Sequence, residues 1–388
     1  MKFLSKKILL LFILSILFIQ CSKKDSPVKT IDFKTSFTAD TLQSTVNSNI
    51  SFRGSATIDD TNIANWEWDF ADGTPVVTTK NVVHKFLFAG SYVVTLTVTN
   101  KTGQTANFST RILIKNTATP NYGNLIGLKE KLALLQPKIM VAAHRAYQKN
   151  YPENSVEAIN DAAFNNINIV EIDARLSLDR ELVIMHDATT NRTTNGSFTV
   201  AQRTLAELKQ LRLLFQGVPT SYTIPTLKES LEAAKGKVYV NIDASWDVSP
   251  FYYNKIYNTV AALNMLNMVM IYTESADVAK GILAIDPNVI VLLGAGNATD
   301  YNNANSMNPK AAIWHLASAT LSPNFTNWPS NNGIKLWANA YVNSSAIPPT
   351  TGNDAMADGL INNQITLIQT DYPLELIRYL QGKNLWLQ

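Results

Sequence analysis

Short apolar runs alternate with helical stretches from Lys138 to the end of the 388-residue chain. This alternation is typical of βα repeats, in which each helix returns the chain so that successive strands pair in parallel. Nine runs are candidate strands, whereas a (β/α)8 barrel needs about eight. We therefore expect an α/β TIM-type barrel with one extra or misread segment. The candidate strands are 139–143, 167–172, 182–185, 238–242, 269–272, 289–293, 311–314, 334–338 and 365–369.

Polar side chains follow several of these runs, at the point where each run ends. Because all strands of a parallel barrel point in the same direction, their carboxyl ends meet at one mouth, where barrel enzymes hold their sites. The sequence therefore predicts that residues far apart in the chain form a single site. These residues are His144, Arg145, Glu171, Asp173, His186, Asp187, Asp243 and Asp371.

Three of the acidic residues predict a cation site. Glu171 and Asp173 are two residues apart on one candidate strand, so their side chains lie on the same face and repel each other unless a cation lies between them. Asp243 adds a third carboxylate at the end of another candidate strand. Such an all-oxygen site suits a hard divalent cation, Ca²⁺ or Mg²⁺.

Two histidines end candidate strands beside this predicted cation. Imidazole takes and gives protons near neutral pH, so His144 and His186 suit an acid/base pair. Arg145, together with the cation, would hold the charge of a phosphate. Any one of these residues is explained equally well as a structural polar group at a strand end, but the complete set favours a catalytic site.

A series of short motifs runs in order through residues 140–388. The motifs are His144-Arg145-Ala146, Pro152-Glu153-Asn154-Ser155, Glu171-Ile172-Asp173, Val183-Ile184-Met185-His186-Asp187, Arg192-Thr193-Thr194-Asn195-Gly196, Thr204-Leu205-x-Glu207-Leu208 and Gln369-Thr370-Asp371-Tyr372-Pro373. Together they resemble the glycerophosphodiester phosphodiesterase family. The resemblance implies a barrel enzyme that hydrolyses glycerophosphodiesters to sn-glycerol 3-phosphate and an alcohol, with two histidines and a divalent cation.

The same resemblance implies a role for each candidate residue. Attack by water and attack by the neighbouring glycerol hydroxyl, through a cyclic phosphate, both need the acid/base pair, so both routes stay open. The implied roles are acid/base catalysis for His144 and His186, phosphate or substrate binding for Arg145 and Trp337, cation binding for Glu171, Asp173 and Asp243, and support of the site for Glu153, Asp187 and Asp371.

One departure from the family pattern concerns the phosphate. The family has a lysine within a residue or two of the third acidic ligand, whereas Asp243 is followed here by Ala244-Ser245-Trp246. Losing that cation costs a few kcal/mol of transition-state stabilisation, unless a group such as Lys335 reaches the site. This departure favours an alternative, a catalytically impaired barrel that acts as a surface phosphodiester- or glycan-binding lipoprotein. The retained histidines and carboxylates favour the enzyme.

Residues 32–116 have a different pattern, in which Val, Thr, Phe and Tyr alternate with polar residues between Asp-Gly and Gly turns. Such alternation predicts an all-β sandwich and therefore a multidomain chain. The segment Trp66–Thr74, followed by His84-x-Phe86 and Ala89-Gly90-x-Tyr92, resembles a PKD-type immunoglobulin-like domain. The resemblance implies that this domain is a spacer or that it binds glycans or proteins, and we favour the spacer. We expect His84 to be a strand residue with a satisfied ring and not a ligand, since no acidic residue or second histidine is nearby in sequence. Residues 117–137 are expected to be a linker with a short helix.

Residues 1–21 combine a basic start with an apolar run that is too short to span a bilayer comfortably. Cys21, the only cysteine, ends this run and resembles the lipid-modified cysteine of a bacterial lipoprotein; residues 22–31 would then be a linker. We expect an exported protein that is lipid-anchored to a bacterial membrane, on its periplasmic face or at the cell surface. The formal net charge of +3 comes with a basic N-terminus, so the mature chain gives no electrostatic reason for a nucleic-acid partner.

Overall fold

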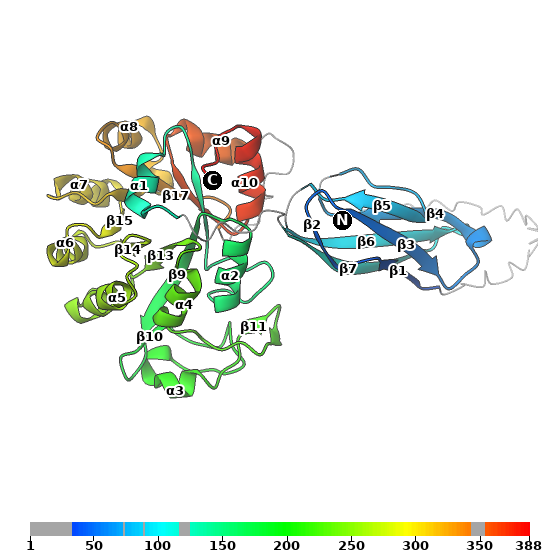
Figure 1. Cartoon of the computed structure of the whole chain (residues 1–388), viewed down its shortest axis with the longest axis horizontal. Helices are drawn as coiled ribbons and strands as arrows, with labels where there is room; N and C mark the ends of the chain where they lie inside the picture. The colour runs from blue at the N-terminus through cyan, green and yellow to red at the C-terminus, as the bar shows by residue number, and fades with distance from the viewer. Residues whose placement is uncertain (1–32, 73, 88–89, 116–124, 343–353) are drawn as a thin grey trace, which may run out of the picture.

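The computed structural model describes residues 33–72, 74–87, 90–115, 125–342 and 354–388. These residues form an N-terminal β domain and a C-terminal α/β domain (Figure 1). Cys21 and the other residues on which the signal and its linker are expected lie outside the described residues. In the part of the chain that is described, no helix is both long enough and apolar enough to cross a membrane.

The β domain is a sandwich of two sheets, as predicted. Alternate side chains of its strands point inward, and Phe52 and Trp68 at its centre are fully buried with ring centroids 5.7 Å apart. One sheet has the order β1 (Thr35–Ala39), β3 (Asn49–Ala56), β5 (Asn81–Lys85), and the other β2 (Gln43–Thr45), β7 (Thr105–Lys115), β6 (Gly90–Asn100), β4 (Ile63–Asp69).

His84 lies in β5 with its ring satisfied, as expected from the sequence, and its partner is an aspartate. Its Nε2 lies 2.7 Å from Asp72 Oδ2, and its ring stacks on Phe70 with centroids 3.7 Å apart. Asp72 is twelve residues away in the chain, and the sandwich brings the two side chains together. The pair is therefore a structural element of the β domain.

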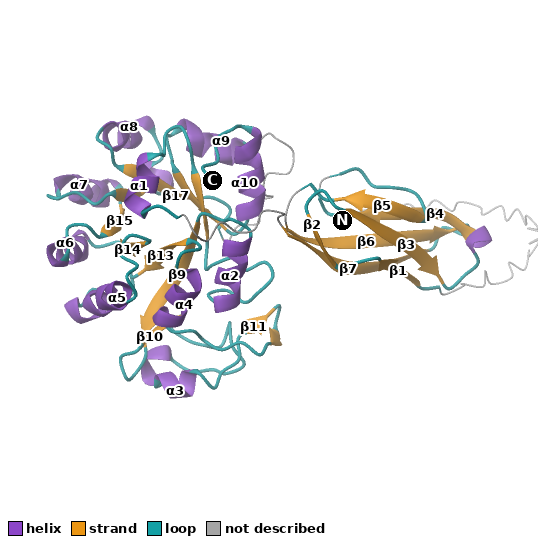
Figure 2. Cartoon of the chain, in the orientation of Figure 1, coloured by secondary structure: helices purple, strands orange, loops and turns teal. Residues whose placement is uncertain are grey.

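The C-terminal domain is a closed barrel, which confirms the predicted (β/α)8 fold. In the described residues eight parallel strands follow one another around it, and the first strand pairs with the second to close the ring. The helices surround these strands (Figure 2). The strands are β8 (Met140–Ala143), β9 (Ile169–Leu176), β13 (Tyr239–Asp243), β14 (Val269–Thr273), β15 (Ile290–Gly294), β16 (Ile313–His315), β17 (Lys335–Asn339) and β18 (Leu367–Thr370).

Short polar side chains begin most of the surrounding helices. Ser155 accepts a hydrogen bond from the backbone N–H of Ala158, and Thr226 accepts one from Glu229, so N–H groups that have no partner within the helix are satisfied. The loops that join strand ends to helices are thereby held in place. The helices are α1 (Leu128–Ala133), α2 (Val156–Phe164), α3 (Leu205–Leu208), α4 (Leu227–Ala234), α5 (Pro250–Ala262), α6 (Ala276–Ile285), α7 (Ala298–Ser306), α8 (Pro323–Asn331), α9 (Ala355–Asn362) and α10 (Pro373–Gly382).

Of the nine candidate strands, β10 (Leu182–Ile184) is the one that is not a strand of the parallel barrel. It pairs antiparallel with β9, with Ile184 opposite Ala174, so it is the returning arm of a hairpin. The hairpin brings the chain back to the barrel mouth, where the Met185 N–H donates to the Asp173 carbonyl at 2.8 Å. The expectation that His186 follows a parallel barrel strand is therefore wrong, although the residue still arrives at the mouth. Between β10 and α4 the chain also forms the short helix α3 and the short hairpin of β11 (Leu214–Phe215) and β12 (Val218–Pro219).

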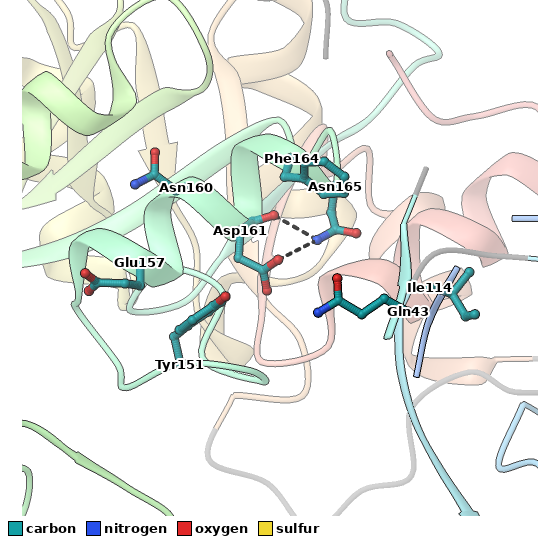
Figure 3. A pocket seen from close by; sticks show the side chains of 8 residues that line it. All are labelled: Gln43, Ile114, Tyr151, Glu157, Asn160, Asp161, Phe164 and Asn165. Carbon is teal, nitrogen blue, oxygen red and sulfur yellow. Dashed lines mark hydrogen bonds between the residues drawn. The ribbon is translucent and has the colours of Figure 1, made fainter. Parts of the chain in front are cut away.

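Polar contacts join the two domains. Arg111 of β7 donates to the Lys149 carbonyl at 3.3 Å, and Arg378 of α10 donates to the Tyr92 hydroxyl at 3.0 Å. A pocket between the domains is shown in Figure 3, where Gln43 of the β domain faces the side chains of α2 and the loop before it. The β domain thus contacts the loop of residues 144–155, which also carries three of the predicted site residues.

Candidate active site

The three predicted cation ligands lie together at the barrel mouth. Asp173 and Asp243 are register partners on β9 and β13, and Glu171 is the partner of Asn241. One carboxylate oxygen from each of Glu171, Asp173 and Asp243 lies within 4.8 Å of the others. Burial and the neighbouring carboxylates raise the pKa of Glu171 well above its usual range, and burial and the charge of Asp173 raise the pKa of Asp243 to about 6. Three negative charges this close repel one another, and either proton uptake or a bound cation relieves the repulsion.

Neighbouring groups hold each of these carboxylates in a fixed orientation. The backbone N–H of Arg145 donates to Glu171 Oε2 at 2.8 Å, and Asn154 Nδ2 donates to Asp173 Oδ2 at 2.7 Å. Ser245 donates to Asp243 Oδ1 through both its N–H, at 2.9 Å, and its hydroxyl, at 2.6 Å.

Asn241 adds an amide oxygen to the same site. It is 2% exposed, and its Oδ1 has no hydrogen-bond partner among the described residues. A hard divalent cation binds oxygen ligands, and this site offers three carboxylates and a buried amide oxygen that receives no hydrogen bond. The residues present therefore fit Ca²⁺ or Mg²⁺.

His144 follows β8 and is oriented by a carboxylate. Its Nδ1 lies 2.8 Å from Asp371 Oδ1, which also accepts a hydrogen bond from Gln148 Nε2 at 2.9 Å. Because a carboxylate accepts, Nδ1 carries the proton and Nε2 keeps its lone pair. The His144 side chain is 8% exposed, so this arrangement holds a deeply placed imidazole ready to accept a proton.

His186 has a similar but more exposed arrangement. Its Nδ1 lies 2.7 Å from Asp187 Oδ1, and its side chain is 31% exposed. Arg192 Nε donates to Asp187 Oδ2 at 2.6 Å, and this hydrogen bond, against the effect of burial, holds the pKa of Asp187 well below its usual range. The ring of Trp246 packs edge-on against His186 with centroids 5.3 Å apart.

Arg145 is held by Glu153 and keeps one unpaired donor. Its Nη1 lies 3.3 Å from Glu153 Oε1, and Arg192 binds the same carboxylate through two nitrogens at 2.6 and 2.8 Å. Arg145 Nε is buried and has no hydrogen-bond partner among the described residues. An unpaired guanidinium N–H at the mouth is suited to a phosphate oxygen. Arg145 and Ala146 have φ angles of 51° and 61°, the left-handed region that favours glycine.

A cavity of about 360 Å³ brings these side chains together. Trp337 lines it and donates from Nε1 to Asn339 Oδ1 at 3.3 Å. Lys335 does not reach the site: it begins β17 at the opposite end of the barrel and donates to the Leu135 carbonyl at 3.5 Å. Of the predicted site residues, the cavity is lined by His144, Arg145, Glu171, Asp173, His186, Asp243 and Trp337, while Asp187 and Asp371 contact its histidines and Glu153 its arginine.

Several lining residues were missed by the sequence reasoning. Asn241 precedes Asp243 by two residues and so shares its strand face. This spacing could have identified it from the sequence. Glu274 directly follows β14, and Tyr272 lies in the same strand. His315 lies with its Nδ1 3.3 Å from the Tyr272 hydroxyl, and burial lowers its pKa to about 4, so it is neutral at pH 7. Glu274, Tyr272 and His315 occupy the side of the cavity formed by β14 and β16.

Family models match both domains. The model of the glycerophosphoryl diester phosphodiesterase family matches residues 144–344, slightly more than half of the chain, and the PKD domain model matches residues 35–114. A glycerophosphodiester phosphodiesterase of Caldanaerobacter subterraneus is 28% identical over 207 residues, which are 52% of this chain and 84% of that protein. One of Bacillus altitudinis is 35% identical over 107 residues, 26% of this chain and 44% of its own length.

Solved structures share the barrel. A glycerophosphoryl diester phosphodiesterase of Parabacteroides distasonis has a TM-score of 0.56 and 21% identity, covering 67% of this chain and 93% of its own. An Oleispira antarctica phosphodiesterase, solved in complex with the product sn-glycerol-3-phosphate, has a TM-score of 0.53 and 21% identity, covering 62% and 96%. At these identities the likeness establishes the fold.

Proposed function

Because the chain belongs to the glycerophosphoryl diester phosphodiesterase family, whose members are phosphoric diester hydrolases, we propose that it hydrolyses glycerophosphodiesters to sn-glycerol 3-phosphate and an alcohol. The observation that carries the proposal is that His144 and His186, each oriented through Nδ1 by a carboxylate, line the same cavity as the three-carboxylate site. The product complex of the Oleispira antarctica relative supports the same chemistry.

Acid/base catalysis follows from the histidine geometry. One imidazole takes the proton of the attacking hydroxyl at its Nε2, and the other, protonated, gives a proton to the departing alcohol oxygen. Asp371 and Asp187 hold the rings by accepting from Nδ1 and stabilise the imidazolium that forms. The attacking hydroxyl belongs to water or to the glycerol itself, since either uses the same pair.

Arg145 and the acidic site hold the phosphate. The unpaired Nε of Arg145 donates to a phosphate oxygen, and its link to Glu153 fixes the guanidinium plane. A divalent cation bound by Glu171, Asp173 and Asp243 supplies positive charge at the reacting phosphodiester. Trp337 provides an apolar wall for the glycerol.

We further propose that the enzyme is exported and anchored to a bacterial membrane by lipid on Cys21, with the PKD domain as a spacer. The support is the apolar run of residues 1–21 that ends at Cys21. Mass spectrometry of the protein isolated from membranes should find an N-terminal diacylglyceryl cysteine. An unmodified Cys21 within an uncleaved chain would contradict the anchor.

The activity is tested by sn-glycerol 3-phosphate release from a panel of glycerophosphodiesters, with Ca²⁺, with Mg²⁺ and with chelator. We expect cation-dependent release that His144→Ala abolishes. His84→Gln is the matched control, because His84 also pairs with a carboxylate but lies in the β domain. Absence of release from every substrate, by protein whose thermal melting shows it to be folded, would reject the enzyme and favour the phosphodiester-binding alternative.

A further inference from the structure

Negative charge predominates in the cavity. Its lining includes four carboxylates, those of Glu171, Asp173, Asp243 and Glu274, but Arg145 is the only Lys or Arg among the described lining residues. A divalent cation offsets two of the four negative charges, and Arg145 is already paired with Glu153. The guanidinium of Arg175, which lies against the lining residue Trp246, acts on Asp173 and Asp243. A phosphodiester is itself an anion, and a carboxylate whose charge is not offset repels it.

Glu274 is the carboxylate that the cation site does not explain. It lies after β14, one strand further around the barrel than Asp243, and is outside the group of three that can share a cation. Its charge acts on Asp243, contributing to the raised pKa of that group. No salt bridge to Glu274 is found among the described residues; its one described hydrogen bond comes from the Tyr272 hydroxyl, at 3.4 Å.

Aromatic faces accompany this carboxylate. Tyr272 and Trp246 both line the cavity with Glu274, and Trp246 already receives the guanidinium of Arg175 at 4.1 Å from its ring centroid. A carboxylate in a cavity that aromatic rings also line suits an ammonium group, through charge and through the ring quadrupole. The neighbouring His315 is neutral at pH 7, since burial lowers its pKa to about 4, so the positive charge already at this wall is that of Arg175 against Trp246.

We propose that Glu274, with Tyr272 and Trp246, binds a positively charged ammonium group on the leaving alcohol, so that the preferred substrates are zwitterionic glycerophosphodiesters. The ammonium neutralises Glu274 while the phosphate lies between Arg145 and the cation site. This inference rests on the proposed phosphodiesterase function and assigns the alcohol subsite to β14. It also explains how the cavity tolerates Ser245 in place of the family lysine: the substrate itself brings the positive charge.

The test compares glycerophosphocholine and glycerophosphoethanolamine with glycerophosphoglycerol, whose alcohol is neutral. We expect the wild type to favour the ammonium substrates in kcat/KM. Glu274→Gln, which keeps shape and removes charge, should reduce that preference by roughly fivefold, the value of a partly exposed ion pair. Asp277→Asn is the matched control: Asp277 is an exposed carboxylate in the first turn of α6 that does not line the cavity, and it should leave the preference unchanged.

Binding is measured separately from turnover, by calorimetric titration of glycerophosphocholine into His144→Ala with and without Glu274→Gln. A weaker affinity only in the double variant supports the ammonium subsite. Equal effects of Glu274→Gln on charged and neutral substrates, or unchanged affinity in the double variant, would overturn it. Absence of hydrolysis of all three substrates would reject the proposed function, and the calorimetric comparison would still decide the role of Glu274.

Discussion

The two carboxylate–histidine pairs should differ in their importance for catalysis, which Asp371→Asn and Asp187→Asn will reveal. Asp371 and His144 have side chains 16% and 8% exposed, and Asp371 also accepts a hydrogen bond from the neutral amide of Gln148. Asp187 is 26% exposed and shares its charge with Arg192, whose Nε lies 2.6 Å from it. His144 therefore depends on its carboxylate more than the exposed His186 does.

The size of the difference follows from the kind of hydrogen bond that is lost. A buried hydrogen bond between an imidazolium and a carboxylate contributes about 1.5–3 kcal/mol, so Asp371→Asn should lower kcat by roughly 10- to 150-fold. For Asp187, solvent and Arg192 screen the interaction with His186, so the hydrogen bond contributes about 0.5–1.5 kcal/mol. Asp187→Asn should therefore lower kcat by roughly 2- to 12-fold. Neither aspartate lines the cavity, so KM should change little in both variants.

The assay is steady-state release of sn-glycerol 3-phosphate at saturating cation, with thermal melting to verify folding. Asp371→Glu serves as the conservative variant, because it keeps the charge and should recover part of kcat. Equal losses in Asp371→Asn and Asp187→Asn, or a change confined to KM, would refute the argument that burial and shared charge set the contribution of each pair.

Three further predictions concern residues around the cation and the phosphate. The fold raises the pKa of Asp243 to about 6, so the contribution of this group to the stability of the cation-free protein is fully present below about pH 4 and is lost as the pH rises through 6, a loss of up to about 3 kcal/mol. Chemical denaturation in chelator and in Ca²⁺ should therefore show that the cation stabilises the protein more at pH 7 than at pH 4.5. Equal stabilisation at the two pH values would contradict this prediction. Ala146→Gly should raise the free energy of unfolding by about 1 kcal/mol, because φ is 61° there; unchanged denaturation would argue against strain. Ser245→Lys should raise kcat/KM for glycerophosphoglycerol about tenfold by adding a cation near the phosphate, and a loss for every substrate would show that the hydroxyl bond to Asp243 matters more.

The sequence predicted the parts of the fold that depend on local pattern. The apolar runs located all eight barrel strands, because strands buried on both faces are nearly continuous in hydrophobic residues. It did not predict the direction of β10, since a run of three buried residues is the same in a parallel strand and in a hairpin arm. The pairing of His84 with Asp72 was missed for a related reason, because only the sandwich brings them together.

The candidate site shows the same division. Residues at strand ends, such as Asp243, were found because the barrel topology places all such ends at one mouth. Glu274 also follows a strand, but a single acidic residue has no spacing pattern. A role for its charge can be inferred only when the other residues that line the cavity are known. Lys335 was suggested for the phosphate, yet it begins its strand and therefore lies at the opposite end.

Ser245 and Glu274 both line the cavity. Ser245 lies where the family pattern has a lysine, and Glu274 is a carboxylate outside the cation site. A barrel that only binds phosphodiesters needs positive charge at the phosphate no less than an enzyme does, so the absent lysine does not by itself favour binding over turnover. A purely binding site also has no need for two imidazoles that each present Nε2, as His144 and His186 do through their paired carboxylates. A substrate that carries its own ammonium group accounts for the missing lysine and for the carboxylate of Glu274, and it keeps the acid/base pair in use.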